Sequence, residues 1–173
     1  MQEIELKFLD IDKEAMHEKL LAIGAEKKYK HKLRSIAFSS HGYSTRAEGT
    51  SQFLRVRQIG DTVILTHKGP NTSKQFKSRV ETEITTQDSF EDTVAFFEAL
   101  GYSPEQESNK YRTHYERGKA HFEIDEWKGL PPFLEIETQS EEEMKSVCTE
   151  LGLDISQGSN KTVTYIYPEH FGY

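Results

Sequence analysis

The sequence has a single cysteine, Cys148, among its 173 residues. One cysteine cannot form an intrachain disulfide, and it excludes a zinc site built on several thiolates. The chain also lacks a long apolar run, so we expect no segment that crosses a bilayer. Its first residues, Met1 to Glu5, lack the basic start and the apolar stretch of a signal peptide. These absences predict a cytoplasmic protein that does not associate with membranes.

Positive charge is also scarce, because 22 Lys and Arg stand against 29 Asp and Glu, for a net charge of −7. A general nucleic-acid binder needs a basic surface that displaces counterions, so the balance argues against one. An acidic chain can still bind a small polyanion if its cations gather in one pocket. The length fits one domain over residues 1–173, large enough for a core without disulfides or metals.

What the chain does have is alternation of polar and apolar residues, the pattern of β-strands with one apolar face. The first stretch is typical: Glu3, Glu5 and Lys7 share one face, and Ile4 and Leu6 share the other. We predict strands at about residues 2–9, 26–38, 52–59, 62–68, 74–85, 109–116, 119–126 and 133–138. Two polar stretches, at 39–51 and 69–73, are predicted to be loops that could act as lids over a site.

Three helices are predicted from their capping signals. Asp10 or Asp12 begins the first, Asp88 or Ser89 the second and Ser140 the third. The expected C-terminal glycines are Gly24, Gly101 and Gly152. Each helix follows a strand that carries Glu-x-Glu, which indicates a repeated strand–helix unit; three unrelated amphipathic helices with ordinary caps are the alternative.

The strand faces opposite the apolar residues carry charge that is sorted by sign. We expect these faces to carry the acids Glu3, Glu5, Glu81, Glu83, Glu123, Asp125, Glu135 and Glu137 and the bases Lys7, Arg55, Arg57, Lys68, Lys77, Arg79, Lys110 and Arg112. Such faces can simply be the solvated side of a sheet. However, like charges two residues apart on one face repel, and their repetition indicates counter-ions supplied by a ligand.

The apolar faces need the three helices as cover, so the charged faces must point away from the helices. About eight strands that close into a barrel would turn these charged faces inward. We therefore predict an α+β fold with a closed eight-stranded antiparallel β-barrel and helices packed on its outside.

The predicted lining suits a triphosphate with one or two metal ions. Arginine and lysine bind phosphate oxygens, whereas carboxylate pairs hold Mg²⁺ or Mn²⁺, hard cations that bridge to phosphate. Zinc is disfavoured because the histidines show no ligand spacing. His114 and His121 fall on charged faces, where we expect hydrogen-bonded neighbours rather than ligands or bases.

Several segments resemble the CYTH superfamily, the triphosphate tunnel metalloenzymes. Glu3-Ile4-Glu5-Leu6-Lys7 is similar to the family's N-terminal E-x-E-x-K signature. Further matching segments follow in order at 54–57, 66–69, 79–83, 110–112, 125–129 and 133–137, so the resemblance spans nearly the whole chain. It implies a tunnel of eight antiparallel strands, activity that depends on Mg²⁺ or Mn²⁺, and a homodimer.

The resemblance also assigns roles to individual residues. The implied metal ligands are Glu3, Glu5, Asp125, Glu135 and Glu137. The implied phosphate-binding residues are Lys7, Arg55, Arg57, Lys68, Arg79, Lys110 and Arg112. The implied catalytic residues are Glu5, Lys68, Lys110, Arg112 and Asp125.

Three functions stay open. The first is a class IV adenylyl cyclase that converts ATP to cyclic AMP and pyrophosphate, favoured by the compact length and three-helix plan. The second is a phosphohydrolase acting on inorganic tripolyphosphate or thiamine triphosphate. The bend Gly129-Leu130-Pro131-Pro132 departs from the cyclase pattern, and Thr164-Tyr165 only echoes its Ser-Tyr motif. The third is a non-catalytic sensor of nucleotides or polyphosphate, which would need the bases but not the acids.

Overall fold

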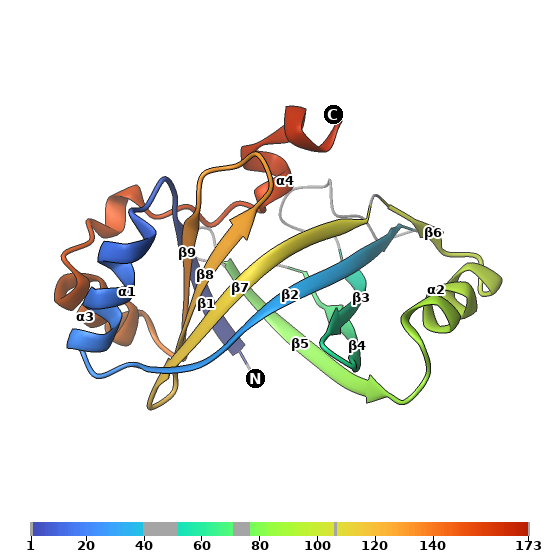
Figure 1. Ribbon diagram of the computed structural model, residues 1–173, viewed down its shortest axis with the longest axis horizontal. Helices are drawn as coiled ribbons and strands as arrows, with labels where there is room; N and C mark the ends of the chain where they lie inside the picture. The colour runs from blue at the N-terminus through green and yellow to red at the C-terminus, as the bar shows by residue number, and fades with distance from the viewer. Residues whose placement is uncertain (1, 40–51, 71–76, 106, 173) are drawn as a thin grey trace.

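The computed structural model describes residues 2–39, 52–70, 77–105 and 107–172. Antiparallel strands form one curled sheet, with helices gathered at its two ends (Figure 1). The strands are β1 (Gln2–Phe8), β2 (Glu26–Ser39), β3 (Phe53–Ile59), β4 (Thr62–Lys68), β5 (Lys77–Thr86), β6 (Ser103–Pro104), β7 (Ser108–Arg117), β8 (Ala120–Trp127) and β9 (Phe133–Thr138). The helices are α1 (Lys13–Ala22), α2 (Phe90–Ala99), α3 (Glu141–Leu151) and α4 (Val163–Ile166), with 3-10 turns η1 (Ile155–Gln157) and η2 (Pro168–Phe171).

The strand pairings follow the order β3-β4-β5-β1-β9-β8-β7-β2, and β2 also pairs with β3. The short strand β6 extends the sheet beside β2. The three strands that carry Glu-x-Glu, β5, β1 and β9, are therefore neighbours in the sheet, each followed in the chain by a helix. The predicted succession of a Glu-x-Glu strand and a helix thus occurs three times, on adjacent strands.

Each of the eight long strands pairs with two neighbours, and the β2–β3 pairing joins the two ends of the order, so the sheet curls into a ring of strands, as predicted. β2 has 14 residues and β3 only 7, so β3 covers one end of β2, at 33–38, while β7 covers 26–35. β5 likewise pairs with β1 through 77–80 and with β4 through 81–86. Because neighbours attach at successive segments, the strands are offset along their axes.

The helices begin where the capping residues predict. The side chain of Asp12 accepts hydrogen bonds from the backbone N–H groups of Glu14 and Ala15 at 3.1 Å. Ser89 and Ser140 cap α2 and α3 in the same way. These contacts satisfy N–H groups that a helix leaves without intrahelical partners. The helices lie on the outer face of the sheet, as predicted: α1 and α3 at one end and α2 at the other (Figure 1).

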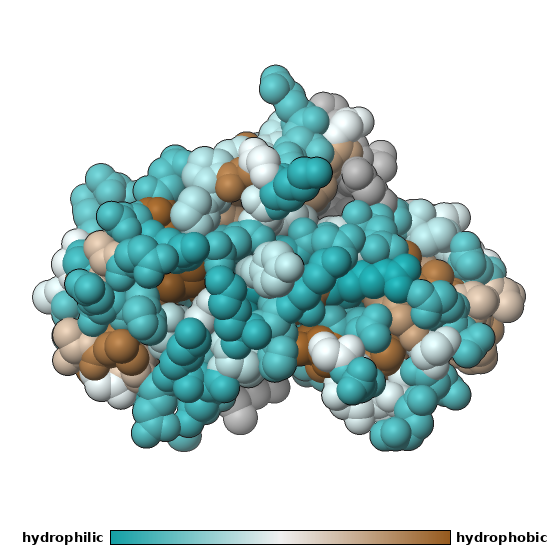
Figure 2. Space-filling model, viewed as in Figure 1, coloured by the Kyte–Doolittle hydropathy of each residue, from teal (hydrophilic) through white to brown (hydrophobic). Residues whose placement is uncertain are grey.

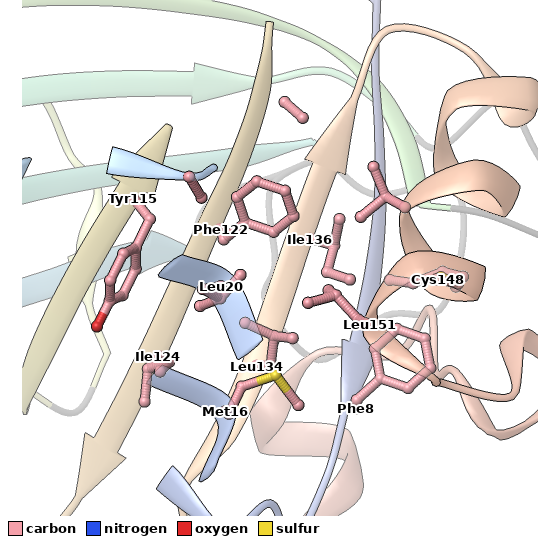
Figure 3. Close-up of a cluster of buried hydrophobic side chains, with 14 of the residues drawn as sticks. Phe8, Met16, Leu20, Tyr115, Phe122, Ile124, Leu134, Ile136, Cys148 and Leu151 are labelled. Carbon is pink, nitrogen blue, oxygen red and sulfur yellow. The ribbon is translucent and has the colours of Figure 1, made fainter. Parts of the chain in front are cut away.

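Two apolar cores lie between the helices and the sheet. In the larger core, Leu134 and Ile136 of β9 pack with Leu20 of α1 and with Cys148 and Leu151 of α3 (Figure 3). The buried residues of the smaller core are Phe38, Val56, Val63 and Phe90, which join β2, β3 and β4 to α2. Each core fixes one end of the sheet and removes the outer faces of the strands there from water, whereas Val80 and Ile84 on the outer face of β5 are each 61% exposed.

The surface between the two ends is mostly hydrophilic, and apolar residues gather toward the helical ends (Figure 2). None of the helices in the described part of the chain is long and apolar enough to cross a membrane. The predicted loops fall largely on 40–51 and 71–73, which lie outside the described residues. The start of the predicted strand 74–85 does so too, and the remainder is β5.

Candidate functional site

Alternation along the strands places the charged side chains on the face of the sheet away from the helices, called the inner face below. In β8, Phe122 and Ile124 lie in the larger core. Glu123 and Asp125 project to the inner face and are only 7% and 0% exposed. Both faces of this strand are thus buried, one by apolar contact and the other by ion pairs. The charged faces are therefore not the solvated side of an open sheet.

Arg112 of β7 joins three carboxylates on the inner face. Its guanidinium donates to both oxygens of Asp125 at 2.7 Å and to Glu135 at 2.7 Å, and it also forms an ion pair with Glu123. Burial lowers the pKa of Arg112, but the three carboxylates outweigh it and raise the pKa above its ordinary value. Lys110 forms a further ion pair with Asp125. A planar guanidinium suits this task because it bonds two carboxylates at once.

Lys7 of β1 lies between two acids. It forms an ion pair with Glu5 on its own strand and another with Glu135 of β9 at 3.1 Å. Burial would lower the pKa of Lys7, but the charges of Glu135 and Glu5 raise it overall. The lysine is only 2% exposed, so these carboxylates keep its charge in the interior.

Glu137 shows that the acids are crowded. The strand register places it directly opposite Glu5, and like charges in that position destabilise a sheet. Burial and the negative charges of Glu123 and Glu5 raise the pKa of Glu137 to about 8. A carboxylate in this position lacks enough positive charge around it. The all-oxygen donors Glu5, Glu135 and Glu137 therefore fit a hard divalent cation, which would relieve this repulsion.

The strands β3 and β4 carry a basic group, Arg55, Arg57 and Lys68. Arg57 lies 3.2 Å and Arg55 3.9 Å from a carboxylate oxygen of Glu83, which also accepts from the hydroxyl of Thr66 at 2.6 Å. Lys68 pairs with Glu81 at 2.5 Å.

Among the residues that the structure describes, Glu81 and Glu83 pair with this basic group, whereas Glu123, Asp125 and Glu135 pair with the bases of β7. Burial and the charges of Arg57 and Arg112 lower the pKa of Arg55 to about 10, so it remains charged at neutral pH. The Nε of Arg57 is buried and has no hydrogen-bond partner among the residues that the structure describes. A buried donor of this kind suits an anionic ligand.

The acids and bases of β1, β7, β8 and β9 and the basic group of β3 and β4 influence one another's pKa values across the inner face. Arg112 of β7 helps to lower the pKa of Arg55 on β3, and Lys68 of β4 partly opposes the rise in the pKa of Glu137 on β9. Strands far apart in the sequence thus face a common space. A ligand with several phosphates and a cation would meet bases on one side and acids on the other.

Most of the predicted site residues come together on this face, and two cannot be placed fully. The brought-together residues are Glu5, Lys7, Arg55, Arg57, Lys68, Lys110, Arg112, Asp125, Glu135 and Glu137. Glu3 and Arg79 are opposite one another in the β1–β5 register. Their side chains lie outside the described residues, so their roles stay predictions.

The site also uses residues that were predicted to line the interior but were not assigned a function. Glu123 bonds to Arg112, and Glu81 and Glu83 bond to the basic group. The alternation of side-chain direction along β5 and β8 predicted the inner-face position of all three acids. Thr66 is different, because nothing in the pattern of β4 distinguishes its hydroxyl from that of an ordinary strand threonine.

The fold and the inner face define a class of protein, one with a curled antiparallel sheet that encloses facing acids and bases. Residues 1–160 match the CYTH domain family, so the chain belongs to the CYTH family. A protein of Methanocaldococcus jannaschii, provisionally named an adenylate cyclase, is 31% identical over 137 residues, which are 79% of this chain and 77% of the relative.

Solved structures have the same fold. One from Vibrio parahaemolyticus, also provisionally named an adenylate cyclase, has a TM-score of 0.80 at 17% identity and covers 96% of this chain and 97% of its own. Another, from Hippeastrum, has a TM-score of 0.65 at 14% identity and covers 97% of this chain and 96% of its own. Its description gives an adenylyl cyclase candidate with a dominant triphosphatase activity.

Proposed function

We propose that this protein is a divalent-metal-dependent enzyme that processes a triphosphate on its inner face. The observation that carries the proposal is the pairing of crowded carboxylates with a facing basic group. Burial and Glu123 raise the pKa of Glu137, while burial and Arg57 lower the pKa of Arg55. A metal–triphosphate complex would bring a cation to the crowded acids and anionic oxygens to the facing bases.

The acids Glu5, Glu135 and Glu137 would hold the cation, Mg²⁺ or Mn²⁺. When bound, such an ion would neutralise charge on the phosphate oxygens and polarise the reacting phosphoryl group. Asp125 is fully buried and already bonds to Arg112 and Lys110. Its geometry favours holding these two bases in place over binding metal itself.

The bases would bind and orient the phosphate chain. Arg55, Arg57 and Lys68 lie on neighbouring strands and can contact successive phosphates, while Lys110 and Arg112 approach from β7. Their hydrogen bonds would strengthen as charge grows on the phosphate oxygens in the transition state. The same side chains serve any triphosphate, so the basic groups alone do not specify which phosphorus is attacked.

Our first candidate reaction is ATP cyclisation. The ribose 3′-hydroxyl would attack the α-phosphorus, forming the O3′–P bond as the bond to the β-phosphate bridging oxygen breaks and pyrophosphate leaves. The Methanocaldococcus relative supports this candidate, because its provisional name is adenylate cyclase and it matches 79% of the chain.

The second candidate is hydrolysis of a triphosphate such as tripolyphosphate or thiamine triphosphate. Here water would attack the terminal phosphorus, the bond from that phosphorus to its bridging oxygen would break, and the diphosphate part would leave, so that orthophosphate and a diphosphate are the products. The bend at 129–132 favours this candidate, because its two prolines depart from the cyclase pattern. The Hippeastrum protein, described as mainly a triphosphatase, shows that the fold is compatible with this reaction.

A product-resolved assay tests the proposal. The purified chain is incubated with ATP and, separately, with tripolyphosphate and thiamine triphosphate, each with Mg²⁺ or Mn²⁺. Cyclic AMP with pyrophosphate supports the cyclase, and orthophosphate supports the phosphohydrolase. Tight binding of these ligands without any product, in either metal, would contradict an enzyme and favour a sensor.

A further inference from the structure

Three side chains that the proposed reaction does not use converge on the inner face near the β7–β8 turn. His114 and Glu116 project from β7, and His121 projects from β8. The Nε2 of His114 lies 3.1 Å from the Oε1 of Glu116 and 3.5 Å from the Nδ1 of His121. The Nδ1 of His121 is 3.9 Å from the same oxygen. Three potential ligand atoms thus form a compact triangle.

The size of this triangle matches a metal centre. Bonds of about 2.0–2.1 Å from zinc to nitrogen or oxygen, in tetrahedral geometry, separate the ligand atoms by roughly 3.3–3.5 Å. The three observed separations span 3.1 to 3.9 Å. Small side-chain rotations would bring all three atoms to bonding distance, with no movement of the strands.

Glu123 supplies an outer partner of the kind that metal-bound histidines have. Its Oε1 lies 3.5 Å from the Nδ1 of His114, on the side of the ring away from the triangle. A carboxylate there favours a proton on Nδ1 and leaves Nε2 free to bind an ion. Tyr29 stacks on the same ring at 4.9 Å between centroids and an angle of 15°, which fixes its plane.

The charges around the triangle leave one carboxylate oxygen for an ion. Lys28 lies 3.8 Å from the Oε2 of Glu116 and also bonds to Glu26 at 2.7 Å. The other oxygen of Glu116, Oε1, is the one that faces the two histidines. His114 is buried, whereas Glu116 and His121 are partly exposed. An ion could therefore reach the triangle from solvent and complete its coordination with water.

We propose that His114, Glu116 and His121 form a transition-metal site of Zn²⁺ type. Two imidazoles and one carboxylate suit such borderline ions, whereas Mg²⁺ prefers the oxygen ligands of the carboxylate group. The histidines are hydrogen-bonded neighbours, as expected from the sequence, and the proposal adds a metal-binding role to that arrangement. The spacing i, i+2 on β7 with a third residue across a hairpin is easily missed in a linear sequence.

The proposed site borders the carboxylates that would hold the hard cation, because its strand β8 pairs with β9. In the register, His121 is opposite Glu137 and His114 is opposite Glu123. A bound transition-metal ion would place positive charge beside both acids. The two proposed metal sites nevertheless share no ligand, so Zn²⁺ binding can be measured independently of any enzymatic reaction.

The test uses the full chain, stripped of metal with a chelator and then titrated with Zn²⁺ in a large excess of Mg²⁺. We expect one Zn²⁺ per chain, and a Co²⁺ replacement with visible absorption bands typical of nitrogen and oxygen ligands. Loss of an outer hydrogen-bond partner of a metal ligand lowers metal affinity by roughly 10- to 100-fold. His121→Ala removes a ligand itself, so it should weaken Zn²⁺ binding by at least this factor. His121 is half-exposed, so we expect this variant to fold.

Two controls make the outcome decisive. His170→Ala removes an exposed imidazole outside the triangle and should leave Zn²⁺ affinity unchanged. Glu137→Gln alters the proposed hard-cation ligands and should leave the Zn²⁺ stoichiometry at one. The proposal is overturned if no Zn²⁺ binds in excess Mg²⁺, or if binding survives His121→Ala but is lost in Glu137→Gln.

Discussion

At the scale of single residues, Arg112 supplies the positive charge that compensates three buried carboxylates. Its guanidinium contacts Glu123, Asp125 and Glu135, and all three carboxylates are buried. We expect Arg112→Met to lower the free energy of unfolding by about 3–5 kcal/mol, because it leaves buried charges uncompensated. Urea denaturation followed by circular dichroism measures this change. A loss below about 1 kcal/mol would show that the carboxylates are compensated by other groups.

Glu137 gives the second prediction at this scale, for the metal-free protein. Its carboxyl has a pKa of 4.5 in its ordinary state and about 8 in the fold. Below pH 4.5 the proton is bound in both states, so the group contributes nothing. As the pH rises toward 8 the unfolded chain releases this proton more readily, and the free energy of unfolding falls, by roughly 1–3 kcal/mol.

Denaturation curves across this pH range measure the effect. Glu137→Gln, which cannot ionise, should be more stable than the wild type near pH 8 and should lack this part of the pH dependence. Excess Mg²⁺ should reduce the dependence in the wild type only. Identical pH profiles for the two proteins would contradict the crowding of the carboxylates.

Alternation along a strand predicts the face on which a single residue lies but not the partner to which it bonds. Alternation correctly placed Glu123, Asp125 and Glu135 on one face, because a strand allows only two side-chain directions. It could not predict which acid bonds to which base, since those contacts depend on strand order and register. Asp125 is the example: the sequence resemblance assigned it to metal, and its bonds to Arg112 and Lys110 emerged only from the β7–β8 register.

At the scale of elements, the helix starts are set by local chemistry. The hydroxyl of Ser140 accepts a hydrogen bond from the backbone N–H of Glu143 at 3.1 Å. We expect Ser140→Ala to cost about 1 kcal/mol of stability, because that N–H loses its partner. Thermal unfolding measures the loss. The cap lies on the outer side, so turnover per folded molecule should be unchanged; a large loss of turnover would show that α3 also shapes the inner face.

Element boundaries were predictable where one signal dominated. Gly152 ends α3 with φ 67°, a left-handed conformation that glycine adopts without strain. The two-residue strand β6 was not predicted, because it is held by pairing with Phe38 and Ser39 of β2 and not by its own sequence.

At the scale of the whole molecule, the two cores differ in size. Among the residues that the structure describes, the larger has fifteen buried residues and the smaller has four. The region of β3, β4 and α2 should therefore open more readily than β8, β9 and α3. Hydrogen exchange should be faster in the first region, and tripolyphosphate with Mg²⁺ should slow it there, because Arg55, Arg57 and Lys68 lie on β3 and β4. Uniform exchange, or protection confined to the larger core, would contradict this picture.

The class of fold was predictable from sequence, but the stagger of the strands was not. Alternation and caps indicate strands with charged inner faces and helices outside, and the sheet has that form. How far a barrel closes depends on the stagger between neighbours, which arises from unequal lengths such as those of β2 and β3. No local pattern reports that stagger.

The central claim is that the acids hold a cation while the bases hold a triphosphate. Its most direct test is the metal dependence of turnover with ATP and with tripolyphosphate, in the wild type and in Glu5→Gln. We predict product from the wild type only when Mg²⁺ or Mn²⁺ is present, and at least a roughly hundredfold lower rate in Glu5→Gln, about 2.7 kcal/mol of lost transition-state stabilisation. Turnover that is independent of metal, or unchanged in Glu5→Gln, would contradict the account.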